Sequence, residues 1–131
     1  MKRRTPITQY CHERIQKMIK EPLLCIDATA GTGKDTVFLA KLVGEKGRVI
    51  SMDIQEMAIE QTKKRLSDRA EVVLDSHAHM DKYAQKDSVS LIMFNLGYLP
   101  GGDHSLSTKA DTTIEALEKG LNLLHEGGMI S

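Results

Sequence analysis

The chain has 131 residues, of which 40% are hydrophobic and 27% are charged. That length allows one domain with a buried core, and that composition excludes a disordered or collagen-like chain. The 18 basic and 18 acidic residues give a formal net charge of zero. We therefore expect a single globular domain over residues 1–131.

The N-terminal segment MKRRTPITQYCHERIQK lacks the apolar stretch of a signal peptide. No run in the chain approaches the roughly 20 apolar residues that cross a bilayer. The two cysteines, Cys11 and Cys25, have neither zinc-knuckle spacing nor the pattern of a disulfide framework. The sequence predicts a cytoplasmic protein with reduced thiols and no membrane partner.

Charge is unevenly distributed along the chain. Residues 1–20 contain six basic side chains and one acidic side chain, Glu13, so the remaining residues carry an acidic excess. A basic N-terminal segment on an acidic body is a typical electrostatic footprint for binding a nucleic acid. The alternative is an N-terminus that only adds solubility.

The first half of the chain alternates helical and strand patterns. Five apolar residues near the N-terminus recur at helical spacing: Ile7, Cys11, Ile15, Met18 and Ile19. They predict an amphipathic helix that ends near Pro22 and lies against a sheet. LLCID (residues 23–27) predicts a strand covered on both faces, and a helix follows from about Asp35 to Val43. RVISMD (48–53) predicts the second strand.

The second half repeats this alternation. The next helix has an inner face of Ala58, Thr62 and Leu66, and the strands EVVL (71–74) and SVSLIMFN (88–95) follow. Apolar residues then step by three and four along a last helix that closes at Gly127 and Gly128, before MIS opens a fifth strand. Those apolar residues are Ile114, Leu117, Leu121 and Leu124.

This order of elements predicts an α/β fold with a Rossmann-like, doubly wound, mostly parallel sheet. Ligands of such sheets bind at the carboxyl ends of the strands. Here those ends carry Asp27, Asp53, Asp75 and Asn95. We expect these four polar side chains to share one rim of the sheet.

The glycine turn in DATAGTGKDT distinguishes between three ligand classes. A P-loop needs Ser or Thr after the lysine, but Asp35 follows Lys34. Two like charges 4 Å apart cost about 4 kcal/mol at an effective dielectric of 20, so this carboxylate disfavours bound phosphates. A dinucleotide motif needs a third glycine where Thr36 stands, and Asp27 would face the pyrophosphate.

S-adenosylmethionine carries an ammonium and a sulfonium, so acidic residues attract it. Gly31 and Gly33 allow the backbone to approach its methionine part, and helix amides can receive its carboxylate. Asp53, about 20 residues beyond the turn, is placed to accept the ribose hydroxyls. The alternative is a plain helix N-terminus, with Asp35 as the cap and glycines for tight packing.

The segment DSHAHMD resembles metal-site patterns, because Asp75, His77, His79 and Asp81 alternate along it. The barrel that uses one such pattern needs a much longer chain. The other pattern continues with a histidine where this chain has Lys82. We therefore predict no metal, with Ser76 and His77 beside Asp75 in an adenine pocket.

The segment FNLGYLPGGDHS places Asn95 at a strand end and Tyr98 three residues later. Enzymes that methylate amines often carry N-P-P-Y here, where the Asn oxygen accepts the amine's hydrogen and the aromatic ring stacks on the base. Such positioning supplies much of the catalysis. Leu96 and Gly97 replace the two prolines, and Asn95 as a simple turn former is the alternative.

With these motifs in view, the chain resembles the YtqB/MnmM family of class I S-adenosylmethionine-dependent methyltransferases, over essentially its whole length. The resemblance implies N-methylation of the 5-aminomethyl group of tRNA wobble uridine, giving 5-methylaminomethyl-2-thiouridine. The alternatives are an rRNA methyltransferase and a non-catalytic module that binds adenosylmethionine or RNA. The implied partner is the tRNA anticodon region, bound through the basic N-terminal segment, with a homodimer as a candidate assembly.

The resemblance also implies roles for individual residues. The methionine part would be held by Asp27, Ala28, Gly31 and Gly33, the ribose by Asp53 and Gln55, and the adenine by Ser76 and His77. The wall between methyl donor and acceptor would be formed by Asn95, Leu96, Gly97 and Tyr98, with Gly102, Asp103 and His104 nearby. The catalytic candidates are Asn95, Tyr98 and His104. His12 would face the RNA. Family members continue through further strands, so we expect a C-terminally truncated fold.

Overall fold

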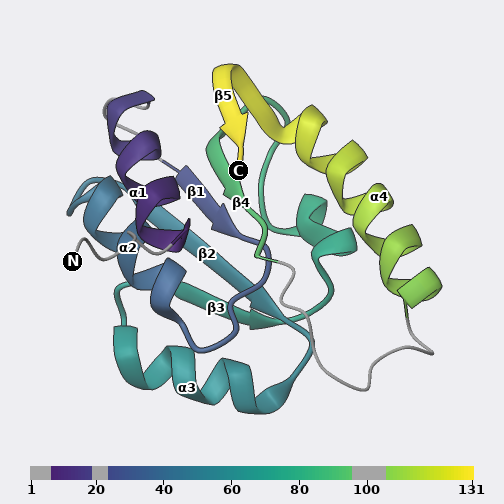
Figure 1. Ribbon diagram of the computed structural model, residues 1–131, viewed down its shortest axis with the longest axis horizontal. Coiled ribbons are helices and arrows are strands. Elements are labelled where there is room, and N and C mark those ends of the chain that lie inside the picture. Colours follow the sequence, from purple (N-terminus) through teal and green to yellow (C-terminus); the bar gives the residue numbers. More distant parts are fainter. Residues whose placement is uncertain (1–6, 19–23, 96–105) are drawn as a thin grey trace, which may run out of the picture.

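The computed structural model describes the backbone of residues 7–18, 24–95 and 106–131. A five-stranded parallel sheet with the order β3-β2-β1-β4-β5 forms its centre (Figure 1). The strands are β1 (Leu24–Asp27), β2 (Arg48–Asp53), β3 (Glu71–Leu74), β4 (Val89–Met93) and β5 (Leu124–Ile130). The α/β class and the parallel sheet predicted from the sequence are therefore confirmed.

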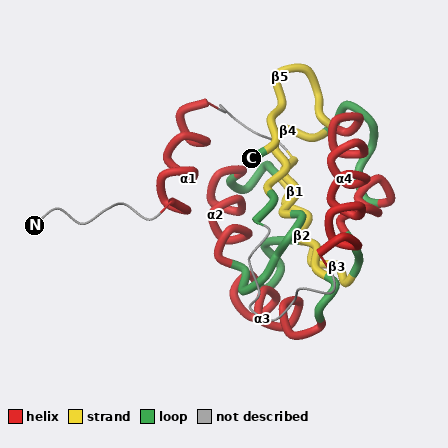
Figure 2. Tube along the Cα trace, turned by 45° about the vertical axis from the view of Figure 1, so that its right-hand side comes forward, coloured by secondary structure: helices red, strands yellow, loops and turns green. Residues whose placement is uncertain are grey.

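The helices connect these strands and cover both faces of the sheet. They are α1 (Ile7–Met18), α2 (Lys34–Val43), α3 (Glu56–Leu66), the 3-10 helix η1 (His77–Lys82) and α4 (Leu106–Leu123). Figure 2 shows α1 and α2 on the opposite side of the strands from α4. The contacts between α4 and η1 put these two helices together on one face.

Two apolar clusters hold the layers together. One contains Ile15 of α1 and Leu39 of α2, packed with Cys25 and Leu91 of the sheet. The prediction that the N-terminal helix lies against the sheet is thus confirmed, because Ile15 is 1% exposed. The other cluster joins the opposite face of the sheet to η1 and α4. Because helices cover both faces of the sheet, every residue of β1 and β4 is buried, and apolar residues are favoured on both faces of these strands.

The last helix and strand differ from the prediction. Ala116 and Leu123 are buried on α4, whereas Ile114 and Leu121 of the predicted apolar stripe are 55% and 65% exposed. The helix lies close to the sheet because Gly120 faces it: a Cβ at that position would come within 3.0 Å of Ile92 Cδ1. Small residues at the contact let the helix approach closely and leave the larger side chains outside.

The end of α4 was also predicted wrongly. The helix ends at Leu123, and β5 begins at the next residue, so Gly127 and Gly128 lie within the strand. β5 pairs with β4 through Leu91 and Met129, with a register shift between Val89 and Leu91. Pairing with a buried neighbouring strand takes precedence here over the helical spacing of Leu124.

The strand register brings the expected polar residues to one rim. Asp27 pairs with Ser51 of β2 and with Met93 of β4, and Asp53 pairs with Leu74 of β3. Asn95 follows two residues after Met93. The carboxyl ends of the strands therefore lie side by side, as parallel pairing requires. No helix in the described part of the chain is both long enough and apolar enough to cross a bilayer.

Candidate functional site

Asp27 lies at the end of β1 and is completely buried. Its carboxylate accepts hydrogen bonds from Thr36 Oγ1 at 2.7 Å and from the backbone N–H of Thr29 at 3.1 Å. Burial raises the pKa of Asp27 to about 7, and the negative charges of Asp35 and Asp53 act in the same direction. A positive charge is therefore favourable at this rim, and a further negative charge is not.

Asp53 connects the glycine turn to the end of β2. One of its oxygens accepts from the N–H of Gly31 at 2.9 Å, and the other accepts from the N–H of Gln55 at 2.9 Å. Gly31 adopts a φ of +57°, and a Cβ there would meet only Thr29 O at 3.8 Å, so its outer side is open. Each carboxylate oxygen retains a further lone pair, so Asp53 can still accept from a ligand hydroxyl.

Gly33 is required for packing between helices. It has a φ of +92°, and a Cβ would lie 3.1 Å from Thr62 Cα and from Arg65 Cδ of α3. Its N–H is donated to Ala30 O at 2.9 Å. Arg65 Nε donates to Thr32 O at 2.7 Å, which ties the turn to α3. The sequence left open whether the glycines serve ligand binding or tight packing, and the surroundings of Gly33 fit tight packing.

The histidines of DSHAHMD point to different partners. His77 lies beside the backbone of Ala28 and edge-to-face against Phe94, with ring centroids 5.6 Å apart. Burial lowers the pKa of His77, so the neutral ring is favoured. His79 is exposed and its Nδ1 lies 2.7 Å from Asp75 Oδ1.

The carboxylate of Asp75 is hydrogen-bonded to residues that follow it closely in the sequence. Tyr83 Oη donates to it at 2.6 Å, and together with His79 this lowers the pKa of Asp75 to about 2. Ser76 caps η1, since its Oγ accepts from the N–H of Ala78 at 3.1 Å. Among the described residues, no group of three or more His, Cys, Asp or Glu is arranged to hold a metal ion.

Asn95 lies at the end of β4 and is exposed. Its N–H donates to Thr29 Oγ1 at 2.6 Å, and its side-chain Nδ2 lies 3.4 Å from Asp35 Oδ2. The other oxygen of Asp35 lies 2.8 Å from Nε2 of His12, on α1. The structure therefore brings Asn95 to the same rim as Asp27 and Asp53. Six further predicted residues lie outside the described part of the chain: Leu96, Gly97, Tyr98, Gly102, Asp103 and His104.

Some residues of this rim were missed by the sequence reasoning. Ile54 follows Asp53 directly and is 69% exposed, which is an apolar surface suited to a flat ring. Arg65 reaches the rim from α3. His12 was predicted to face the RNA, but the structure places it against Asp35. Only the exposed side chain of Ile54 beside a strand-end carboxylate carried a local signal, because the contacts of Arg65 and His12 depend on the packing of helices.

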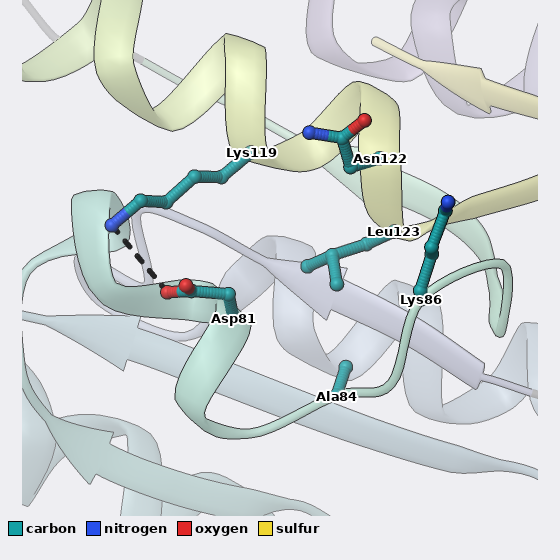
Figure 3. Close-up of a pocket in the computed structure, with 6 residues that line it drawn as sticks. All are labelled: Asp81, Ala84, Lys86, Lys119, Asn122 and Leu123. Carbon is teal, nitrogen blue, oxygen red and sulfur yellow. Dashed lines mark ion pairs between the residues drawn. The ribbon is translucent and has the colours of Figure 1, made fainter.

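A hollow lies away from this rim (Figure 3). It is open and lies between η1, the segment before β4 and the C-terminal end of α4. Lys119 Nζ pairs with Asp81 Oδ1 at 3.5 Å across it. The six lining residues are Asp81, Ala84, Lys86, Lys119, Asn122 and Leu123. Lys86 and Leu123 precede β4 and β5, so this hollow belongs to the amino ends of the strands.

Two protein-family models match the chain. The model described as "Putative rRNA methylase" matches residues 49–131, which is more than half of the chain. The chain belongs to this rRNA methylase family. The model described as "Protein-L-isoaspartate(D-aspartate) O-methyltransferase" matches residues 6–87, which hold the glycine turn and Asp53. Both families are methyltransferases, and the predicted family resemblance is confirmed.

Three relatives support membership of the rRNA methylase family. The chain is 37% identical to "tRNA (mnm(5)s(2)U34)-methyltransferase, chloroplastic" of Arabidopsis thaliana, over 98% of this chain and 52% of that protein. A "putative rRNA-methylase" from Clostridium thermocellum is 47% identical, with a TM-score of 0.82 over 99% of this chain and 72% of that chain. A "putative methyltransferase" from Streptococcus mutans is 33% identical, with a TM-score of 0.79 over 98% and 72%.

These comparisons confirm the Rossmann-like methyltransferase fold. The Streptococcus mutans protein was solved in complex with SAH, the product left when S-adenosylmethionine gives up its methyl group. S-adenosylmethionine is therefore the cofactor of the family, as the sequence predicts. The chain spans about half the length of the Arabidopsis relative.

Proposed function

We propose that this protein is an S-adenosylmethionine-dependent RNA methyltransferase that N-methylates the 5-aminomethyl group of tRNA wobble uridine. The observation that carries the proposal is the gathering of Asp27, Asp35 and Asp53 beside an open glycine turn. Burial is the main cause that raises the pKa of Asp27 to about 7, and repulsion by the charges of Asp35 and Asp53 adds to it. A ligand with a net positive charge, such as S-adenosylmethionine, relieves that repulsion, whereas a polyphosphate increases it.

The cofactor would lie across the strand ends. Asp53 and Gln55 would hold the ribose. One Asp53 oxygen accepts from Gly31 in the glycine turn, and the other accepts from Gln55 just after β2, so the carboxylate lies between these two segments. Gly31 and Ala28 line the methionine part. Asp27 is fully buried, so it would attract the cofactor's ammonium electrostatically, across the turn, and not by direct contact.

The adenine would lie between Ile54 and η1. Ser76 and His77 begin η1 directly after the end of β3, and Ile54 presents exposed apolar surface at the end of β2. A neutral His77 packed on Phe94 gives an uncharged, partly apolar wall. Such a wall suits a flat, uncharged purine.

The chemistry needs one deprotonated amine beside one methyl group. When bound, S-adenosylmethionine supplies an electrophilic methyl carbon on sulfur. Asn95 Oδ1 accepts an N–H of the amine, which turns the nitrogen lone pair toward that carbon. The new N–C bond forms as the C–S bond breaks, sulfur takes the electron pair, and the nitrogen loses one proton. Tyr98 would stack on the base, and His104, Asp103 or bulk water would accept the proton.

The proposed substrate rests on two further observations. The Arabidopsis relative carries the name of a tRNA (mnm(5)s(2)U34)-methyltransferase. The N-terminal segment of this chain is basic, and Arg14 and Lys17 are exposed on α1, where they can contact phosphates. An rRNA substrate is the second candidate, favoured by the description of the matching family.

Radiolabelled methyl transfer distinguishes these functions. The protein is incubated with labelled S-adenosylmethionine and one of two RNAs. The first is tRNA that carries 5-aminomethyl-2-thiouridine, and the second is rRNA from cells that lack this methyltransferase. We expect label in the anticodon fragment of tRNA, as a methylamine. Label in rRNA alone would favour the second candidate, and cofactor binding without transfer to either RNA would favour a non-catalytic binding module.

Location and assembly are also proposals. We propose a cytoplasmic protein, although the relative from Arabidopsis is named as chloroplastic. Fluorescence microscopy of a tagged protein tests the location. Sedimentation at micromolar concentration distinguishes a monomer from a homodimer.

A further inference from the structure

The side chain of Asn95 is held by residues of two helices that lie far from it in the sequence. Asn95 Nδ2 lies 3.4 Å from one oxygen of Asp35, and the other oxygen lies 2.8 Å from His12 Nε2. Asp35 is only 7% exposed, whereas Asn95 is exposed. One buried carboxylate therefore connects α1, α2 and the end of β4.

This carboxylate determines which way the Asn95 amide faces. An ionised carboxylate can only accept hydrogen bonds, so it pairs with the amide NH₂ and not with the amide oxygen. The opposite branch of the amide, Oδ1, is then left to accept from another donor. An amide with no such neighbour could present either its NH₂ or its oxygen to a substrate.

His12 in turn fixes Asp35. The imidazole lies flat on the ring of Phe38, with centroids 3.8 Å apart and an interplanar angle of 5°. Phe38 and Asp35 belong to the same helix, so the stacked ring holds Nε2 against the carboxylate. Rotation of the Asp35 side chain would lose this hydrogen bond in a largely buried place, which is unfavourable.

We propose that Asp35 and His12 are positioning residues, which hold Asn95 so that its Oδ1 faces the acceptor amine. The inference rests on the proposed amine methylation. Its physical basis is orientation: a misplacement of about 1 Å in such a group can reduce the rate about 100-fold. The alternative is that Asp35 is only a favourable acidic residue in the first turn of α2.

Two variants test this role in catalysis. Asp35→Asn keeps the shape but offers either end of an amide to Asn95, and we expect kcat to fall by about 10- to 100-fold. His12→Phe keeps the stacking on Phe38 but loses the hydrogen bond, and we expect a smaller fall. Asp35→Asn also removes one of the three rim carboxylates, so its kcat is measured at saturating S-adenosylmethionine. His12→Phe leaves those carboxylates in place, and its Kd for S-adenosylmethionine should stay within about twofold. Asp68→Asn, the same change at an exposed residue, is the matched control.

An exchange of the two side chains gives a rescue experiment. Asn95→Asp alone places two carboxylates together and should lower kcat. The double variant Asp35→Asn with Asn95→Asp restores one donor facing one acceptor and leaves a carboxylate oxygen for the amine. We expect the double variant to be about tenfold more active than the product of the two single effects would give. Purely multiplicative single effects would overturn the inference.

A spectroscopic measurement tests the positioning without any substrate. In ¹⁵N-labelled protein, the side-chain NH₂ signals of Asn95 are identified by their loss in Asn95→Asp. We expect them to shift in Asp35→Asn and in His12→Phe, and to stay in place in Asp68→Asn. Signals that do not move in the first two variants would overturn the inference. A parent protein that binds S-adenosylmethionine but methylates neither RNA would instead contradict the proposed function alone.

Discussion

At the scale of single residues, the main feature of the site is a buried carboxylate, Asp27, whose charge a cationic ligand would neutralise. Asp27 has no exposed surface, and its two oxygens are held by Thr36 and Thr29. Thr36 also contacts Ser51 at 2.8 Å, which extends the network to β2. These bonds favour the ionised form of Asp27, and burial, the larger effect, opposes it.

The raised pKa of Asp27 predicts how stability depends on pH. The folded pKa, about 7, lies above the ordinary aspartate pKa of 3.8, so the folded state binds more protons between these values. The free energy of unfolding should therefore fall as pH rises from about 4 to 7, by up to about 1.4 kcal/mol per pH unit from this group. Denaturant melts of the parent and of Asp27→Asn without cofactor measure the difference. Parallel curves for the two proteins would contradict it.

The same group predicts how cofactor binding depends on pH. A bound cation favours ionised Asp27, so binding below pH 7 must displace a proton. The association constant for S-adenosylmethionine should rise by up to about tenfold per pH unit between pH 5.5 and 7. Calorimetry in buffers of different ionisation enthalpy should detect proton release. Asp27→Asn should remove this slope, and an unchanged slope would show that another group titrates.

Asp53 offers a direct test of the ribose assignment. Asp53→Ala removes charged hydrogen bonds worth about 1.5–3 kcal/mol, so the Kd for S-adenosylmethionine should rise by about one to two orders of magnitude. Asp81→Ala removes an exposed carboxylate of η1 and serves as the control. Calorimetry measures both. An unchanged Kd in Asp53→Ala would refute the ribose assignment.

At the scale of helices and strands, the sequence predicted most of the architecture. β2 and β3 have the predicted bounds, because each has an apolar centre between charged or glycine-containing segments. The inner face of α3 was also correct, since Ala58, Thr62 and Leu66 are all buried. Here the apolar spacing and the buried face coincide.

The prediction failed where small residues make the contact. Ala116 and Gly120 of α4 face the sheet and carry little apolar signal, whereas the exposed Ile114 and Leu121 carry a strong one. The same limit applies to the site. Strand-end residues such as Asp53 could be placed from the sequence, but the contact of His12 with Asp35 could not, because 23 residues separate them.

The turn between β1 and α2 gives a prediction at this scale. Gly33→Ala adds a Cβ at a φ of +92°, 3.1 Å from Thr62 Cα. Strain and crowding should lower the free energy of unfolding by about 1–3 kcal/mol. Gly44→Ala is the matched control, since its φ is also positive but nothing lies within 4 Å of the added Cβ. Equal effects in urea melts would mean that packing against α3 contributes nothing.

At the scale of the whole molecule, charge divides the protein into a basic N-terminal segment and an acidic strand-end rim. In the proposed function the segment contacts phosphates and the rim holds a cation, so one neutral chain would bind two oppositely charged partners. The two surfaces meet at α1, where His12 contacts Asp35 while Arg14 and Lys17 remain exposed.

This division predicts a salt-dependent affinity for tRNA. Each phosphate contact contributes a slope of about −0.7 to −0.9 to log K against log salt concentration. Replacing Lys2, Arg3 and Arg4 with alanine should reduce the slope by up to about 2–3 without changing the Kd for S-adenosylmethionine. Filter binding at several salt concentrations measures it. A slope equal to that of the parent would exclude these residues from the RNA surface.

The central claim is that the carboxylates at the rim select a cationic adenosyl ligand over polyphosphates. Titration calorimetry of the protein at pH 7.5 with S-adenosylmethionine, ATP and NAD tests it most directly. We expect saturable binding of S-adenosylmethionine and at least about 100-fold weaker binding of ATP and NAD, because close like charges cost several kcal/mol. Binding of ATP or NAD as tight as that of S-adenosylmethionine would contradict the claim.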